Sequence, residues 1–195
     1  DFENYILELK KISKLPLIIF PGALSQISPN ADALLYISVV SGRNPEYLFG
    51  NHVIAAPLIK KYQLETLSTG YMIIESGKRT TAEYMSGSQP IPRNKTEIAI
   101  ATALAAQYMG MKFVYLEAGS GAESSVPYEM VKGVSDYCDI DIIVGGGIRT
   151  PEAASKMVKS GANIIVTGNH FEDENNWEVL KQFADAVHYK KSIVV

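Results

Sequence analysis

The sequence predicts an α/β fold, and within that class a modified (β/α)8 (TIM) barrel whose third helix is replaced by an irregular segment. Short β-branched runs alternate along the chain with longer runs of helical period, which is the pattern of repeated βα units. The expected strands are continuously apolar, as in a parallel sheet whose faces are both covered. At about 31 residues per unit, the 195 residues correspond to six units rather than eight.

The expected elements follow one another as strand and helix. Strands are expected at residues 17–20, 34–40, 66–75, 113–118, 141–144 and 163–167. Helices are expected at residues 45–62, 95–109, 127–137, 151–159 and 177–187, and before the first strand, where one face carries Phe2, Ile6, Leu9 and Ile12. Asn44 before Pro45 and Thr150 before Pro151 mark two helix starts, because each pair joins a capping residue to a first-turn proline. The inward face of the helix 95–109 is expected to consist of Ile98, Ala101, Ala105 and Tyr108.

Two connections depart from the regular pattern. Residues 21–32, with Pro21, Gly22 and Pro29, are too short and too broken for a crossover helix, so the outer ring of helices should have a gap there. Residues 76–94 are long for a loop between a strand and a helix, and loops of that length are usually functional or disordered. Four basic residues of this region fit either a cover over an anionic substrate or a plain exposed loop: Lys78, Arg79, Arg93 and Lys95.

Six strands do not close an eight-stranded barrel. We therefore expect the first strand, the first helix and the second strand of the barrel to lie before Asp1. Residues 1–195 contain no low-complexity stretch and no internal boundary, which predicts a single domain. An open, doubly wound sheet is the competing architecture.

The composition narrows the class of protein. A net charge of −3 and an apolar content of 47% argue against a disordered chain and against an electrostatic nucleic-acid binder. The single cysteine, Cys138, excludes an intrachain disulfide and a cysteine-built metal site, and it suits a reducing compartment, so a cytoplasmic location is expected. The longest apolar runs are far shorter than the ~20 residues that a membrane span needs.

Glycine-rich turns follow the last two expected strands. The segment 144–151 reads Val-Gly-Gly-Gly-Ile-Arg-Thr-Pro, and Val-Thr-Gly-Asn occupies residues 166–169. Glycines let backbone N–H groups approach an anion, and the last two βα loops of a barrel often form a phosphate site. A plain tight turn is the alternative, and Arg149 suits a phosphate and a neighbouring carboxylate equally well. The backbone N–H groups expected at the phosphate are those of Gly146, Gly147, Gly168 and Asn169.

A carboxylate stands near the end of the strand 113–118. Tyr115 and Glu117 should point to one face of this strand, and Leu116 and Ala118 to the other. A carboxylate at the carboxyl end of a barrel strand lies in the mouth of the active site, where Glu117 is placed to accept a proton from a substrate hydroxyl. Tyr115 would orient that substrate. A solvated glutamate at the start of a loop is the alternative.

These motifs resemble the geranylgeranylglyceryl phosphate synthase family. The resemblance is carried by Tyr115-Leu116-Glu117-Ala118-Gly119-Ser120-Gly121, by Gly145-Gly146-Gly147-Ile148-Arg149 and by Gly168-Asn169, and it extends over residues 1–188. The Glu-Ala-Gly-Ser-Gly form is similar to that of the archaeal-type enzymes and their bacterial relatives. The heptaprenyl-using bacterial branch typically has a shorter segment there.

The resemblance implies a prenyltransferase of ether-phospholipid biosynthesis. It would move a geranylgeranyl group from its diphosphate to the 3-hydroxyl of sn-glycerol 1-phosphate, with Glu117 as the base and Tyr115 beside it. The residues implied in binding glycerol 1-phosphate are Tyr115, Leu116, Glu117, Ala118, Gly119, Ser120, Gly121, Gly145, Gly146, Gly147, Arg149, Gly168 and Asn169.

The resemblance also implies magnesium and an oligomer. In the family, Mg²⁺ is held by an Asp after the first barrel strand and by a Ser or Thr after the second, so no metal ligand is expected within the given chain. The family forms dimers and hexamers, which predicts a homo-oligomer. A peripheral contact with a membrane during product release is a further expectation.

An apolar groove for the prenyl chain is expected where the third helix is missing, between the strand 17–20 and the helix 45–62. The candidate lining residues are Phe20, Leu24, Tyr36 and Tyr71, with Ile27 and Met72 as further candidates. Plain core packing would explain any one of them. Two other functions stay open at this point: a barrel isomerase acting on a phosphosugar, and a non-catalytic phosphometabolite-binding barrel. Heptaprenyl diphosphate is the alternative prenyl donor.

Overall fold

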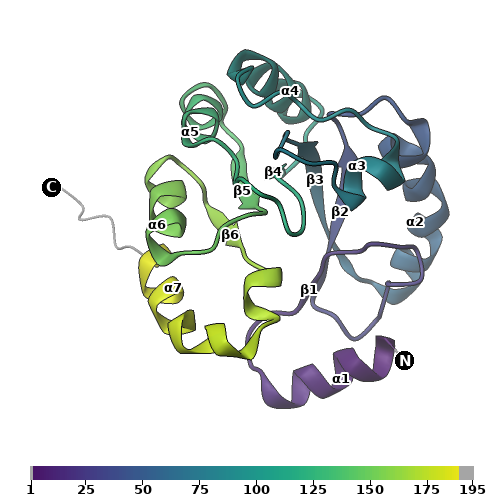
Figure 1. Cartoon of the computed structure of the whole chain (residues 1–195). Helices are drawn as coiled ribbons and strands as arrows, with labels where there is room; N and C mark the ends of the chain where they lie inside the picture. Colours follow the sequence, from purple (N-terminus) through teal and green to yellow (C-terminus); the bar gives the residue numbers. More distant parts are fainter. Residues whose placement is uncertain (1, 189–195) are drawn as a thin grey trace, which may run out of the picture.

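A computed structural model describes residues 2–188 as a curled, six-stranded parallel sheet with helices on its outside (Figure 1). The strands lie side by side in chain order, from β1 to β6, and every neighbouring pair is parallel. This unbroken order rules out a doubly wound sheet, whose strand order reverses at a switch point. The strands are β1 (Ile18–Ile19), β2 (Ala33–Val39), β3 (Glu65–Ile73), β4 (Phe113–Glu117), β5 (Asp141–Gly145) and β6 (Ile164–Val166).

The helices follow the strands around the outside of the curl in Figure 1. The α-helices are α1 (Phe2–Ile12), α2 (Asn51–Tyr62), α3 (Thr81–Ser86), α4 (Thr96–Tyr108), α5 (Tyr128–Tyr137), α6 (Pro151–Lys159) and α7 (Leu180–Val187). A π-helical turn, η1 (Glu46–Gly50), leads into α2, and two 3₁₀ segments, η2 (Asn169–Phe171) and η3 (Glu174–Val179), precede α7. All six strands and the helices expected from the sequence are therefore present, with ends shifted by a few residues.

Alternate strand residues enter two different cores. On β4, Val114 and Leu116 belong to a large outer core that includes residues of α4, α5 and α6. Tyr115 instead packs on the inner face, with Tyr71 of β3 and Ile143 of β5, which are its partners in the register of the sheet. The period of two places Glu117, the last residue of β4, at the carboxyl end of this inner face.

The connection from β1 to β2 contains no helix, as the sequence predicts. Strand β1 pairs only with Ala33 and Leu34 of β2, and residues 20–32 then run irregularly. The upper part of β2, residues 35–39, therefore has no strand on its β1 side within residues 2–188. This free edge explains how a cavity can open there.

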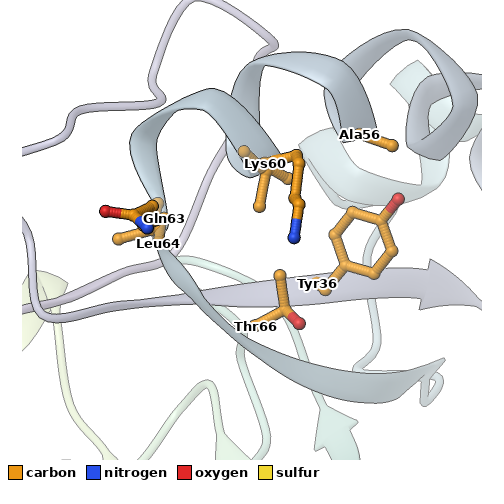
Figure 2. Close-up of a pocket in the computed structure, with 7 residues that line it drawn as sticks. Tyr36, Ala56, Lys60, Gln63, Leu64 and Thr66 are labelled. Carbon is orange, nitrogen blue, oxygen red and sulfur yellow. The ribbon is translucent and has the colours of Figure 1, made fainter.

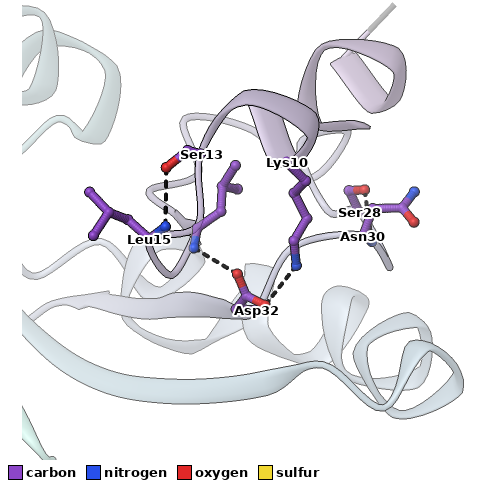
Figure 3. A network of polar contacts seen from close by, with 7 residues as sticks. Lys10, Ser13, Leu15, Ser28, Asn30 and Asp32 are labelled. Carbon is purple, nitrogen blue, oxygen red and sulfur yellow. Dashed lines mark hydrogen bonds and ion pairs between the residues drawn. The ribbon is translucent and has the colours of Figure 1, made fainter. Parts of the chain in front are cut away.

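A small polar network ties α1 to the start of β2 (Figure 3). The Asp32 carboxylate accepts hydrogen bonds of 2.7 Å from the Leu17 N–H and from the Lys10 ammonium. The Leu17 N–H, and after it the Lys10 ammonium, lower the pKa of Asp32. Lys10 and Asp32 are solvent-exposed, so this ion pair contributes little to stability, but it fixes how α1 approaches the edge of the sheet.

Three expectations about the helices need correction. The long connection after β3 contains α3, whose first turn is a capping box between Thr80 and Glu83. The first turn of the helix expected from residue 45 is π-helical. The third correction concerns α4: its expected inward residues Ile98, Ala101, Ala105 and Tyr108 do not form the buried face. That face consists of Ala99, Ala103 and Ala106.

The rotation of α4 has a packing reason. Small alanines let the helix lie close to β3, where a Cβ at Gly70 would be only 2.9 Å from the Ala106 Cβ. Nearly every face of α4 is apolar, so periodicity alone does not select the buried one.

Candidate active site

An aromatic cluster fills the inner face below the carboxyl ends of the strands. The ring centroids of Tyr71 and Tyr115 are 5.2 Å apart. Phe20, which follows β1, packs against both rings, at 6.0 Å from Tyr71 and 5.6 Å from Tyr115. Phe20 is half-exposed while both tyrosines are buried, so Phe20 forms the open side of the cluster.

Glu117 lies above this cluster with only 6% of its surface exposed. Its Oε1 accepts a 2.6 Å hydrogen bond from the Gly119 N–H. Burial raises the pKa of Glu117 above its ordinary value, and hydrogen bonds from Gly119, Tyr115 and Tyr71 offset this only in part. The solvated glutamate considered from the sequence is therefore wrong: this carboxyl is enclosed, and it binds protons more strongly than a surface glutamate.

The two tyrosines act as hydrogen-bond donors to Glu117. Burial, and next the charge of Glu117, raises the pKa of both Tyr71 and Tyr115 above the ordinary value. Both hydroxyls are therefore protonated at neutral pH. Sequence reasoning placed Tyr71 in the groove for the prenyl chain and missed its contact with Glu117. The signal for this contact lies in the pairing of β3 with β4, which puts Tyr71 directly opposite Tyr115.

The glycines after β5 make room for these groups. Gly145 pairs with Glu117 in the sheet, and a Cβ at Gly145 would lie 2.3 Å from the Tyr115 hydroxyl oxygen. At Gly146, where φ is +82°, a Cβ would lie 2.6 Å from Glu117 Oε1. Gly147 also has a positive φ, of +69°, and its Cβ would lie 2.9 Å from the backbone nitrogen of Ser125. No side chain larger than hydrogen fits at these positions without displacing the site.

The loops after β4 and β6 meet across the end of β5. The Asn169 Oδ1 atom accepts hydrogen bonds from the Ser120 hydroxyl and from the Gly121 N–H, the latter at 3.1 Å. The Asn169 amide nitrogen donates to the Glu172 carboxylate at 3.1 Å. Gly168 lies beside Asn169 in open space, since a Cβ there would have no atom within 4 Å. The structure thus brings together the segments 119–121 and 168–169, which the sequence assigned to one binding site.

Other predicted binding residues lie farther from this centre or face away from it. The side chains of Leu116 and Ala118 are fully buried in the outer core, so only their backbone faces the site. Arg149 is exposed, and its Nη2 donates a 2.6 Å hydrogen bond to the Ala122 carbonyl, a partner that the sequence did not predict.

Part of the long connection after β3 reaches the site. A Cβ at Gly119 would lie 2.3 Å from the Thr80 Cγ2 atom, so the capping residue of α3 packs against the β4 loop. Arg93 Nη1 donates hydrogen bonds to the carbonyls of Glu75 and Ser125, at 3.0 Å and 2.8 Å. Of the four basic residues of this connection, Arg93 thus helps to hold two loops together.

A cavity of about 400 Å³, which we call the groove cavity, opens at the free edge of β2. Its walls are mostly apolar and come from the irregular segment after β1, from β2 and from the start of α2; they include Leu24, Ile27, Leu35, Tyr36 and Ile37. Of the predicted groove residues, Leu24, Tyr36 and Ile27 line it, whereas Phe20 and Tyr71 belong to the aromatic cluster. The prediction that Met72 lines the groove is wrong, because its side chain is completely buried in the outer core.

No group of three or more His, Cys, Asp or Glu side chains within residues 2–188 is arranged to hold a metal ion. In the same part of the chain, no helix is long and apolar enough to cross a membrane.

Comparison with known proteins supports the motif assignment. The model of the PcrB family matches residues 1–187. The chain belongs to the PcrB family. A geranylgeranylglyceryl phosphate synthase of Chitinophaga pinensis is 48% identical over 186 residues, which are 95% of this chain and 73% of that protein. Another, from Flavobacterium johnsoniae, is 47% identical, and the match covers 90% of this chain and 72% of that protein.

A solved structure of the family superimposes closely on this one. The crystal structure of (S)-3-O-geranylgeranylglyceryl phosphate synthase from Thermoplasma acidophilum, in complex with the substrate sn-glycerol 1-phosphate, has a TM-score of 0.90 and 38% sequence identity. The match covers 95% of this chain and 74% of that structure. The resemblance that the motifs indicated is therefore confirmed, together with the assignment to a family of synthases.

Proposed function

We propose that this protein transfers a geranylgeranyl group from its diphosphate to the 3-hydroxyl of sn-glycerol 1-phosphate. The observation that carries the proposal is the buried Glu117, with its two tyrosine donors, beside the joined loops after β4, β5 and β6. Two relatives that are 48% and 47% identical to this chain are named geranylgeranylglyceryl phosphate synthase, which supports the proposal. So does the glycerol phosphate complex of the Thermoplasma acidophilum enzyme, at 38% identity.

Glycerol phosphate would bind through backbone N–H groups. The positive φ values of Gly146 and Gly147 turn the chain just before α6 starts, and helix starts favour negative charge. Gly168 and Asn169 would close the site from the other side. The link from Asn169 to Ser120 and Gly121 holds these loops together, which lowers the ordering cost of binding.

Glu117 would accept the proton of the 3-hydroxyl. In the transfer, the bond between the first prenyl carbon and the diphosphate oxygen breaks, with the electron pair leaving on the diphosphate. A bond forms between that carbon and the glycerol oxygen, and the hydroxyl proton moves to Glu117. The raised pKa of Glu117 makes it a stronger base than a surface carboxylate. Tyr115 and Tyr71 would hold its oxygens in place.

The groove cavity would take the prenyl chain. Its walls are apolar over most of their extent, and burying hydrocarbon there is favourable at about 25 cal/mol per Å². Heptaprenyl diphosphate is the alternative donor, and the length of the groove decides between the two.

Magnesium stays a prediction. Residues 2–188 offer no cluster of ligands that would hold it, so we derive no step of the reaction through a metal.

We further propose that the six strands belong to a single-domain (β/α)8 barrel. The curl of the sheet supports this (Figure 1). The chain spans about three quarters of the relatives that it matches, 73% and 72% for the two synthases above. A homo-oligomer, a cytoplasmic location and a peripheral membrane contact for product release are parts of the same proposal.

The decisive experiment incubates the full-length protein with labelled sn-glycerol 1-phosphate and geranylgeranyl diphosphate, and extracts the lipid product. We expect labelled ether lipid from the wild type, and about 10²-fold less per unit time from Glu117→Gln. No product from the wild type, or equal rates for both proteins, would contradict the proposal.

A further inference from the structure

We propose that the ring of Tyr36 is the wall that ends the groove cavity, so that this residue limits the length of the prenyl chain. The inference rests on the proposed function, because it concerns the site that would hold the prenyl donor. Beyond that function, the inference assigns chain-length specificity to one residue. It also identifies a second cavity that the prenyl chain cannot enter in the wild-type protein.

Two cavities meet at Tyr36. On one side lies the groove cavity. On the other side a second cavity of about 490 Å³, which we call the helix pocket, lies between α2 and the strands β2 and β3 (Figure 2). The helix pocket is lined by Tyr36, Ala56, Ile59, Lys60, Gln63, Leu64 and Thr66. Among the residues that line these two cavities, Tyr36 alone is common to both.

The neighbouring residues of α2 show the same division. Ala55 and His52 line the groove cavity, whereas Ala56 and Lys60 line the helix pocket. The boundary between the two cavities therefore follows the contact between this helix and the Tyr36 side chain.

Tyr36 is held in this position by His52. Its hydroxyl donates a 2.8 Å hydrogen bond to the His52 carbonyl. The two rings meet edge to face, with centroids 4.4 Å apart. Two contacts of this kind oppose rotation of the ring, and burial raises the pKa of Tyr36, so the hydroxyl keeps its proton.

The chemistry changes on crossing this wall. The groove cavity is bordered by Leu24, Ile27 and Ile37, which suit hydrocarbon. The helix pocket presents the polar ends of Lys60, Gln63 and Thr66, and Figure 2 shows the Lys60 amine near Tyr36 and Thr66. A prenyl chain that stops at Tyr36 stays among apolar groups. Removing the ring would join the two cavities and give a longer chain a space to enter.

The test measures binding and does not depend on turnover. Calorimetry gives the dissociation constants of geranylgeranyl diphosphate and of geranylfarnesyl diphosphate, which is one isoprene unit longer. For full-length Tyr36→Ala we expect the affinity for the longer donor, relative to the shorter one, to rise about tenfold over the wild type, because the extra unit becomes buried.

Two matched variants separate the wall from other effects. Tyr36→Phe keeps the ring and loses only the hydroxyl, so its affinity ratio should stay within about twofold of the wild type. Ile37→Ala enlarges the groove cavity but leaves the wall, so its ratio should also stay near that of the wild type. Thermal unfolding checks that each variant is folded, and Tyr36→Leu replaces Tyr36→Ala if the latter does not fold.

An unchanged ratio in Tyr36→Ala, or an equal rise in Ile37→Ala or in Tyr36→Phe, would overturn the role of the Tyr36 ring while leaving the proposed function intact. A wild type that binds neither diphosphate would overturn both.

Discussion

The hydroxyl oxygen of Tyr115 occupies the space that a side chain at Gly145 would need. The two residues lie on neighbouring strands, and a Cβ at Gly145 would be 2.3 Å from this oxygen and 3.0 Å from the ring carbons Cε2 and Cζ. Gly145 is therefore part of the site for a reason other than phosphate binding. Gly145 leaves room for the buried Tyr115 ring beside Glu117, and Glu117 is the residue that pairs with Gly145 in the sheet.

This contact predicts a coupled pair of substitutions. Gly145→Ala should destabilise the protein by about 1–3 kcal/mol, because either the Tyr115 ring or the backbone must shift. In a Tyr115→Phe background the cost should be smaller, since the closest atom is gone. Urea unfolding of the two single variants and the double variant measures the coupling. Equal costs of Gly145→Ala in both backgrounds would show that the hydroxyl does not cause the strain.

The hydrogen bonds to Glu117 predict a shift in the pH profile. Only the ionised carboxylate can act as a base, so kcat/KM should rise with pH through the raised pKa of Glu117. Tyr71→Phe removes a donor that favours the ionised form, so the rising limb should move to higher pH. Tyr84→Phe, an exposed tyrosine on α3, is the control and should leave the limb in place. A limb that does not move in Tyr71→Phe would exclude the Tyr71 hydroxyl as a partner of Glu117.

The same raised pKa predicts how stability depends on pH. A carboxyl whose pKa is higher in the folded than in the unfolded state binds more protons when folded, so its effect on stability becomes less favourable as the pH rises. Glu117→Gln removes this cost. The gain in the free energy of unfolding from Glu117→Gln should be larger at about pH 8 than at about pH 5. A gain that is the same at both pH values, or larger at the lower one, would contradict the enclosed, proton-binding carboxyl.

Much of the site could be predicted because it depends on two simple regularities. The period of two along β4 places Glu117 and Tyr115 on one face. The carboxyl ends of neighbouring parallel strands share one edge, so the glycine turns and Asn169 were expected near each other. These regularities belong to single strands and to chain order, and a sequence displays both.

The features that the sequence did not predict depend on contacts between helices and strands. The Tyr71 contact with Glu117 requires the register of β3 against β4, which no local pattern gives. The buried face of α4 depends on how closely Ala106 approaches Gly70, because its apolar residues surround the helix. The wall at Tyr36 depends on the shortness of β1, which leaves the edge of β2 open. The capping box of α3 is different, since the Thr80–Glu83 spacing is local and could have been used.

The open space at Gly168 allows a direct test of the glycerol phosphate site. A Cβ at Gly168 meets no atom within 4 Å, so Gly168→Val meets no steric obstacle, and thermal unfolding checks that the variant folds at the backbone angles of this position, φ −121° and ψ −90°. The new side chain should obstruct the phosphate and raise the dissociation constant of glycerol 1-phosphate by about tenfold or more. Calorimetry measures this constant, and Gly168→Ala, a smaller change, should give a smaller loss. Unchanged binding in Gly168→Val would place the phosphate elsewhere.

The groove cavity can be tested from its entrance with a bulky substitution. Ala23 is exposed and lies on the irregular segment that borders the cavity, so a tryptophan there should fill part of the space for the prenyl chain. A longer chain needs more of that space. Ala23→Trp should therefore reduce the catalytic efficiency with geranylgeranyl diphosphate more than with farnesyl diphosphate, by about tenfold in the ratio of the two.

Ala101→Trp is the matched control for this prediction, because Ala101 is also an exposed alanine, lies on α4 and is outside the residues that line the cavity. It should leave both efficiencies unchanged. If Ala23→Trp lowers the two efficiencies by the same factor, the substitution disturbs the protein generally and the prenyl chain does not pass Ala23. A selective loss with the longer donor, absent from Ala101→Trp, is the result we expect, because the groove cavity lies between the free edge of β2 and the irregular segment that carries Ala23.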